Sequence, residues 1–276
     1  MRILLTGDYR RDEFARALAE MSQADEVVSV DALPAAAEWL KGQAAIDLVV
    51  VAQARPGQFP LIQIEAIRNG APLAPIVALL GSWCEGEMRS GSPWPGVTRV
   101  YWHQWVERLR QESEKWAGGQ PGAWTRPPTA TPEDRLLWSD TSRDGQCHQI
   151  VAVVSGHNET RDWLAAACDI WNMSTVTLGR PPTEQLEGIA LVLWDAGPSI
   201  AGAIEAFARG ISQFPGAQAV VLADFPRAED VESFLAGGAA TVLSKPLLLN
   251  DLLAVVTRVS NEKRAAAHPP SVGRSP

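Results

Sequence analysis

Short runs of consecutive apolar residues recur along this chain, and they constrain its fold more than any other feature. In the second half these runs lie at 148–155, 174–179, 189–195, 217–224 and 240–244. Most show almost no polar alternation, which is typical of parallel strands covered on both faces of their sheet. Helical patterns separate the runs, at 159–171, 182–187, 199–214, 227–235 and 247–259. This order predicts an α/β fold with a five-stranded parallel sheet.

The first half repeats the same order of apolar runs. An offset of 143 residues places 46–52 on 189–195 and aligns the following runs without a gap. At the first strand, Thr6-Gly7 matches Ser155-Gly156. We therefore expect two tandem doubly wound, flavodoxin-like domains. Convergent βαβ patterning without a duplication is the alternative.

Composition places the domain boundaries. Residues 112–147 are rich in Pro, Gly, Ser and Thr and sustain no hydrophobic period, which predicts a linker. Residues 263–276 turn charged and then Pro-rich, which predicts a disordered tail. The expected domains are therefore 1–111 and 148–262.

The composition also restricts the partners and the compartment. A formal net charge of −8 disfavours non-specific binding to nucleic acid. No run of about 18 apolar residues is present, so we expect no membrane span. The three cysteines, Cys84, Cys147 and Cys168, show no paired spacing, so we interpret them as reduced thiols. We expect a cytoplasmic protein.

Two stretches of the second half carry a resemblance to a known family. In a doubly wound sheet the working crevice lies beyond the carboxyl ends of the strands. The stretch LVLWDAGPS places Asp195 at such an end, and AGGAATVLSKPLLLNDLLAVV does the same for Lys245 before a proline. Their order, and their separation of about fifty residues, resemble response-regulator receiver domains. The resemblance covers roughly 149–260.

The resemblance implies a phosphotransfer site, but this sequence retains little of it. In the family, two acids after the first strand hold Mg²⁺, and a third carboxylate takes a phosphoryl group from a phosphohistidine. A switch Thr or Ser and a Lys then contact the phosphate. Here Asp195 matches the phosphoacceptor and Lys245 the lysine. Ser155 and Gly156 stand in the acidic positions, while Ala223 and Val242 stand in the switch positions.

The first half retains still less. The resemblance and the fixed offset place Ala52 in the phosphoacceptor position, Leu80 in the hydroxyl position and Trp102 in the lysine position. Thr6 and Gly7 stand where the acids belong. An alanine cannot be phosphorylated, so we expect no phosphotransfer in this half. Because the acidic positions of both halves lack carboxylates, we expect no bound Mg²⁺ in either half, and we expect no other cofactor.

Three interpretations of Asp195 and Lys245 remain open on the sequence: a residual phosphorylation site, a structural ion pair, or two solvated strand ends. Our leading hypothesis is a non-catalytic signalling or scaffold protein of tandem pseudo-receiver domains that binds proteins. The alternatives are a working receiver phosphorylated at Asp195 by a histidine kinase, and an unrelated doubly wound enzyme or small-ligand binder. By resemblance, residues 227–259 form the face expected to bind a partner or a second copy.

Overall fold

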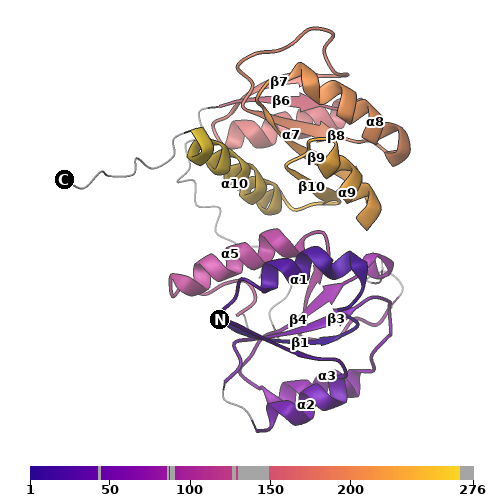
Figure 1. Cartoon of the computed structure of the whole chain (residues 1–276), viewed down its shortest axis with the longest axis vertical. Helices are drawn as coiled ribbons and strands as arrows, with labels where there is room; N and C mark the ends of the chain where they lie inside the picture. The colour runs from indigo at the N-terminus through magenta and orange to yellow at the C-terminus, as the bar shows by residue number, and fades with distance from the viewer. Residues whose placement is uncertain (43–44, 86, 88–90, 126–128, 130–148, 268–276) are drawn as a thin grey trace, which may run out of the picture. The chain divides into compact units, whose positions relative to one another are not determined.

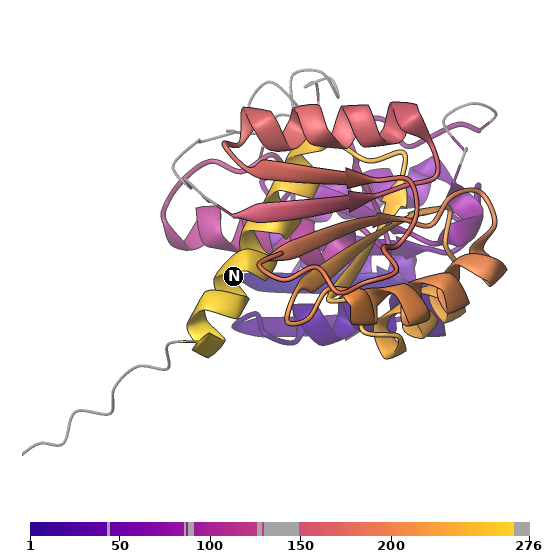
Figure 2. The same ribbon diagram turned by 90° about the horizontal axis from the view of Figure 1, so that it is seen from above.

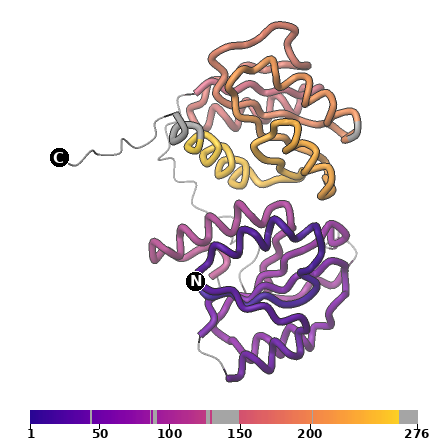
Figure 3. The backbone as a smooth tube through the Cα atoms, viewed as in Figure 1, coloured from indigo at the N-terminus to yellow at the C-terminus, as the bar shows by residue number. Residues whose placement is uncertain are grey.

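The computed structural model describes residues 1–42, 45–85, 87, 91–125, 129 and 149–267. The chain divides into two compact units, Met1–Asp140 and Thr141–Pro276. In each unit a central sheet is flanked by helices (Figures 1 and 3). The two units are described separately below.

The first unit contains a five-stranded parallel sheet with the order β2-β1-β3-β4-β5. The order reverses beside β1, which is the doubly wound arrangement. The middle strand β3 is buried along its whole length, as its unbroken apolar sequence predicts. The strands are β1 (Arg2–Gly7), β2 (Glu26–Val30), β3 (Leu48–Gln53), β4 (Ile76–Leu80) and β5 (Thr98–Tyr101).

Helices cover both faces of this sheet (Figure 1). On one face α2 and α3 lie together, and Leu33, Ile64 and Ile67 pack there against the buried strand residues Val49 and Val51. On the other face α1 and α5 lie side by side. The helical elements are η1 (Asp12–Phe14), α1 (Ala15–Met21), α2 (Leu33–Leu40), α3 (Leu61–Gly70), η2 (Ser82–Cys84) and α5 (Trp105–Ala117).

The second unit contains a second five-stranded parallel sheet, with the order β10-β9-β8-β6-β7. This is the same doubly wound arrangement. The strands are β6 (Ile150–Val154), β7 (Ser174–Leu178), β8 (Leu191–Asp195), β9 (Gln218–Asp224) and β10 (Thr241–Lys245). The helical elements are α7 (Asn158–Ile170), α8 (Ile200–Gly210), η3 (Ile211–Gln213), α9 (Ala228–Ala236) and α10 (Leu249–Ala267).

The two faces of this sheet have different cores. Leu164 of α7 and Leu252 of α10 belong to one core with strand residues such as Leu193. On the opposite face, α8 and α9 lie side by side (Figure 2). The Phe207 ring lies 5.3 Å from the Trp194 ring and 5.9 Å from the Phe234 ring, both nearly edge to face. The expected fold class is therefore observed in both halves.

The helix expected at 182–187 is wrong, because this segment forms turns and bends. In the first unit α2 occupies the connection between the second and third strands. The matching connection of the second unit, between β7 and β8, is five residues shorter. It also contains Pro181 and Pro182, which restrict helical backbone. Instead, the Leu186 amide donates to the Gln213 carbonyl oxygen over 2.8 Å.

Strand registers relate the two sheets position by position. The offset of 143 holds in the three strands from β3 to β5, which pair in the same register as β8 to β10. At the first strand, the expected match of Thr6-Gly7 with Ser155-Gly156 is wrong by one residue. Ile3 pairs with Leu48, and Val151 pairs with Leu191, so Gly7 rather than Thr6 is the counterpart of Ser155. Asp8 is then the counterpart of Gly156.

The first unit extends beyond residue 111, where we placed its boundary. Helix α5 continues to Ala117, and the following segment folds back on it. The Glu112 carboxylate accepts hydrogen bonds from the amides of Ala123, over 2.8 Å, and Trp124, over 3.1 Å. Trp124 is buried and lies against Trp105, with 5.3 Å between ring centroids. This clamp brings residues up to Thr125 into the first unit.

The remainder of the expected linker, 126–147, lies outside the described residues apart from Thr129, and so does Cys147. At the other end, α10 continues to Ala267, so 263–267 is helical rather than a disordered tail. Residues 268–276 also lie outside the described part. Among the described residues, no helix is long and apolar enough to cross a membrane.

Candidate functional site

The polar residues of the second unit meet at the carboxyl edge of its sheet. Ser155 follows β6, while Asp195, Asp224 and Lys245 are the last residues of β8, β9 and β10. Parallel strands end at one edge, so residues separated in sequence by up to ninety positions come together here. The structure brings together the three sequence-predicted residues Ser155, Asp195 and Lys245.

Asp195 is the centre of this site. Its side chain is fully buried, and both carboxylate oxygens accept hydrogen bonds. Oδ1 accepts from the Lys245 ammonium over 2.7 Å and from the Gly197 amide over 3.2 Å. Oδ2 accepts from the Ser155 hydroxyl over 2.6 Å. These donors satisfy a carboxylate that would otherwise be costly to bury.

Lys245 reaches across β9 and joins two carboxylates. Its Nζ lies 2.7 Å from Asp195 Oδ1 and 3.1 Å from Asp224 Oδ1. The lysine side chain is 23% exposed and that of Asp224 is 37% exposed. Asp224 therefore shares the ammonium from the solvent side. The interpretation of Asp195 as a solvated strand end is wrong, since the structure forms a buried ion pair.

The contacts shift the pKa of both partners in opposite directions. Burial favours the neutral acid at Asp195, but hydrogen bonds from Lys245, Ser155 and the Gly197 amide outweigh it, and its pKa is lowered. Burial likewise opposes the charge of Lys245, but its bonds to Asp195 and Asp224 prevail, and its pKa is raised. The pair is therefore charged at neutral pH.

The two positions that hold acids in receiver domains have other roles here. The Ser155 hydroxyl donates to Asp195, and its own oxygen accepts from the His157 amide over 3.1 Å. The Ser155 carbonyl oxygen accepts from Arg161 Nη1 over 2.6 Å, so a guanidinium lies beside this position. Gly156 is exposed, with open space where a side chain would project. Neither residue offers a carboxylate to a hard cation.

The switch positions are buried and apolar. Ala223 is fully buried in β9, and Val242 is buried in β10. Neither can donate a hydrogen bond to a phosphoryl oxygen. Within the described parts of the chain, no group of three or more His, Cys, Asp and Glu side chains is arranged to hold a metal ion.

Sequence reasoning missed two members of this site. The Gly197 amide donates to Asp195 from a residue with φ of +66°, and Arg161 contacts the Ser155 backbone from the first turn of α7. A glycine two residues after a strand-end aspartate is a signal for the first contact. Nothing in the sequence distinguished Arg161 from a solvated helix residue.

The equivalent edge of the first unit contains no comparable charged pair at the matching positions. Ala52 and Leu80 are fully buried, and Trp102 is nearly so. Thr6 is fully buried as well. Gly7 has a φ of +95°, and a Cβ added to it would lie 2.4 Å from the Ala52 carbonyl oxygen. Backbone therefore closes the place where a site would form.

Asp8 follows β1 at this edge, and other contacts engage it. Its amide donates to the Ala52 carbonyl oxygen over 2.9 Å. Its carboxylate oxygen Oδ2 accepts from Arg11 Nε over 2.6 Å and from Gln58 Nε2 over 3.1 Å. The side chain is thus part of a local network beside β1 and β3.

Similarity to known proteins is found among solved structures. No family model matches the sequence, and no curated protein matches it. Among solved structures, a CheY-like response regulator receiver domain from Methanospirillum hungatei JF-1 is similar at 15% identity and a TM-score of 0.39. The match covers 43% of this chain and 98% of that one. A response regulator from Thermotoga maritima is similar at 19% identity and a TM-score of 0.35, over 41% and 98% of the chains.

A further match spans both units. A protein assigned as a two-component system response regulator/ggdef domain protein is similar over 95% of this chain and 99% of its own, at 15% identity and a TM-score of 0.36. The strand orders of both units are those of a doubly wound α/β fold. At these identities the likeness concerns the fold, and the role of each residue rests on the contacts described above.

Proposed function

We propose that this chain is a non-catalytic signalling or scaffold protein made of two pseudo-receiver units, which acts by binding other proteins. The observation that carries the proposal is the state of Asp195. Its buried carboxylate accepts bonds on both oxygens from groups of this chain, and the neighbouring acidic positions are Ser155 and Gly156.

The chemistry of phosphoryl transfer explains why this arrangement is unsuited to it. A carboxylate nucleophile needs a free oxygen, with metal and ammonium charge to stabilise the transferring group. Here Lys245 supplies one positive charge, but the second oxygen accepts a hydrogen bond from Ser155 and the side chain is fully buried, which hinders its attack on a phosphoryl donor. We expect no Mg²⁺ to bind, because one buried and already paired carboxylate is a poor ligand set for this cation.

The first unit supports the same proposal. Its counterpart of Asp195 is Ala52, which has no group that can be phosphorylated. The unit nevertheless keeps a five-stranded sheet with a buried core, so its fold is maintained without the chemistry. A receiver-like unit without a phosphoacceptor can still present surfaces to a partner.

We place the partner face on 227–259, which contains α9, β10 and the first part of α10. Phe225 is 58% exposed beside this segment and Leu248 is 37% exposed within it. Exposed apolar side chains of this size are candidate contacts for a second copy or for a signalling protein such as a histidine kinase. A cytoplasmic location and the absence of nucleic-acid and membrane binding complete the proposal.

Incubation with acetyl phosphate tests the proposal directly. The full chain, with and without millimolar Mg²⁺, should show no phosphoryl adduct by intact mass, and the two thermal melts should superimpose. The double variant Ser155→Asp with Gly156→Asp restores both acids and removes the hydrogen bond on Oδ2. We expect Mg²⁺ to raise its melting temperature, because a ligand that binds the native state stabilises it.

A working receiver at Asp195 is the second candidate, and the 2.7 Å contact between Asp195 and Lys245 favours it. Stoichiometric phosphorylation of the unmodified chain, absent in Asp195→Asn, would establish that function and refute ours. An enzyme or small-ligand binder at this crevice is the third candidate, and no contact described here favours it.

A further inference from the structure

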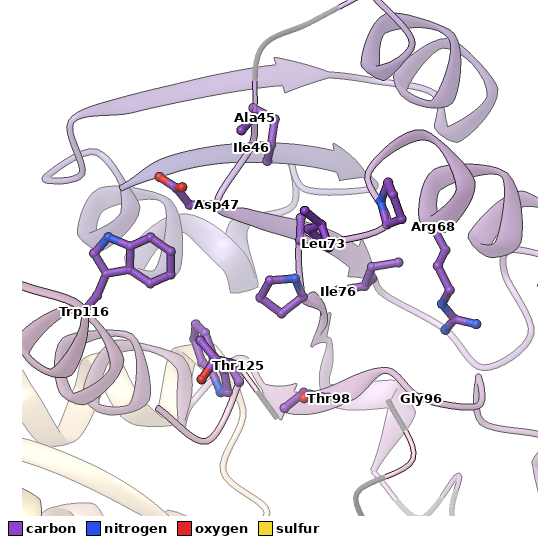
Figure 4. A pocket seen from close by; sticks show the side chains of 14 residues that line it. Ala45, Ile46, Asp47, Arg68, Leu73, Ile76, Gly96, Thr98, Trp116 and Thr125 are labelled. Atoms are coloured by element: carbon purple, nitrogen blue, oxygen red, sulfur yellow. The ribbon is translucent and has the colours of Figure 1, made fainter. Parts of the chain in front are cut away.

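Three neighbouring hollows lie at the opposite, amino end of the first sheet. One cavity of about 430 Å³ is bordered by the starts of β3, β4 and β5, the end of α5 and the segment folded back on α5 (Figure 4). A second, of about 620 Å³, runs between α1 and α5, and a narrow one of about 20 Å³ lies between them. Trp116 lines all three, and we refer to these adjoining cavities together as the groove.

Two tryptophans at this groove have different roles. Trp124 is buried, packs on Trp105 and is held by the Glu112 carboxylate, so it supports the wall. Trp116 is 42% exposed near the end of α5, where its indole borders each cavity. Figure 4 shows it on the same side of the cavity as Asp47. An indole face presented to solvent is a surface on which a cation can lie.

Carboxylates outnumber cations along the groove. Glu20, Asp25, Asp47, Glu112 and Glu114 line it, against Arg68, Arg110 and the Met1 amino group. Glu20 pairs with Arg110, with Oε1 and Nε 2.6 Å apart, and Asp25 pairs with the Met1 amino group, which leaves Asp47, Glu112 and Glu114 against Arg68. The charge of the lining therefore favours a positively charged occupant.

The remaining lining combines apolar side chains with uncharged polar ones such as Thr98, Ser113 and Thr125. Leu73 is 96% exposed at the rim, between Pro72 and Pro75. A long groove with an apolar wall and a few polar groups is typical of sites for extended peptides, whose aliphatic stems cover apolar surface while their charged ends reach a counter-charge.

We propose that this groove binds an extended basic segment of a partner protein, with an arginine or lysine side chain lying on the Trp116 indole beside Asp47. The site is separate from Asp195 and Lys245, and it does not depend on whether Asp195 can be phosphorylated.

The test uses the full-length protein and a short fluorescein-labelled peptide with arginines spaced by glycine, serine and alanine. The matched control peptide carries neutral citrulline in place of each arginine. Fluorescence anisotropy should show binding of the arginine peptide at least about tenfold tighter than of the citrulline peptide, as expected for a desolvated cation–π contact with a nearby carboxylate. Added salt should weaken it.

Variants assign this binding to the groove. Trp116→Ala should lower the affinity about tenfold, and Trp116→Phe, which keeps an aromatic face, should retain most of it. Asp47→Asn should lower the affinity less than Trp116→Ala does. The asparagine side-chain oxygen can still accept the hydrogen bond that the Arg2 amide donates to Asp47 Oδ2 over 2.7 Å. Trp83→Ala is the control, because Trp83 is 71% exposed on the same unit but follows β4 at the carboxyl edge.

Equal affinity for the arginine and citrulline peptides would overturn the proposal, and so would an equal loss of affinity in Trp83→Ala and Trp116→Ala. The absence of binding at millimolar peptide, in a chain whose circular dichroism is unchanged, would overturn it as well. Self-association of the full chain that Trp116→Ala abolishes would also overturn it, by making a second copy the occupant.

Discussion

At the scale of single residues, the ion pair of Asp195 and Lys245 governs the stability of the carboxyl edge of the second sheet. The carboxylate is fully buried and the ammonium is 23% exposed, so the two charges are unequal in their access to water. Breaking a buried pair leaves one charge without compensation, whereas replacing both partners removes the desolvation cost as well. The stability of this edge therefore depends on which partner is changed.

Lys245→Met should destabilise the protein by about 3–5 kcal/mol, because it leaves Asp195 buried without its main donor. The double variant with Asp195→Asn should recover part of this loss. Urea unfolding measures both. Lys41→Met is the matched control, since its ion pair with Glu38 is exposed and should contribute less than about 1 kcal/mol. Equal effects at Lys41 and Lys245 would contradict the buried ion pair.

The pH dependence follows from the direction of the two pKa shifts. The pKa of Asp195 is lowered from 3.8 by its bonds to Lys245, Ser155 and Gly197, although burial opposes this. Its contribution to stability is therefore complete above pH 3.8 and is lost as the pH falls through its folded pKa. The pKa of Lys245 is raised from 10.5, so its contribution is lost only as the pH rises through its folded pKa.

We expect the stability difference between the unmodified chain and Asp195→Asn to be constant near neutral pH and to shrink on acidification below 3.8. Unfolding in urea at a series of pH values measures this. Glu38→Gln, at an exposed pair, is the control. A difference that grows as the pH falls would show that the pKa of Asp195 is raised instead.

At the scale of the elements, the contact between β1 and β3 decides whether the first unit could contain a crevice. The Asp8 amide donates to the Ala52 carbonyl oxygen, and this approach requires a residue without a side chain at Gly7. The clamp on α5 is a second such contact. There the Glu112 carboxylate accepts hydrogen bonds from the amides of Ala123 and Trp124, in a segment whose composition had predicted a linker.

Gly7→Ala tests the close approach of these strands. The added Cβ would meet the Ala52 backbone at 2.4 Å with a φ of +95°, so we expect a loss of more than about 2 kcal/mol. Gly57→Ala is the control, because Gly57 also has a positive φ but has open space around it. Thermal and urea unfolding compare the two. A similar small loss in both variants would mean that β1 can move away from β3.

At the scale of the whole molecule, each unit has its own sheet and its own buried core. Each is also within the size range of an independently folding domain. Any self-association through 227–259 should then reside in the second unit, where α9, β10 and α10 lie.

Fragments 1–140 and 141–276 test this division. Each should unfold cooperatively by circular dichroism. In sedimentation velocity, any self-association of the full chain should persist in 141–276 and disappear in 1–140, and Leu248→Asp should reduce it. Glu205→Arg, at an exposed position of α8, is the control. A fragment 141–276 that fails to fold alone would contradict the independence of the units.

The sequence by itself determined the strands, their parallel pairing and the edge at which Asp195 and Lys245 lie. Unbroken apolar runs and right-handed connections leave few alternatives for these features. The tertiary structure alone decided that Ser155 occupies the second oxygen of Asp195, that Glu112 folds Trp124 onto α5, and that Trp116 lines a groove. It also replaced the helix at 182–187 with turns and moved the counterpart of Ser155 from Thr6 to Gly7. These outcomes depend on register, connection length and contacts between residues far apart in the chain, which local periodicity does not encode.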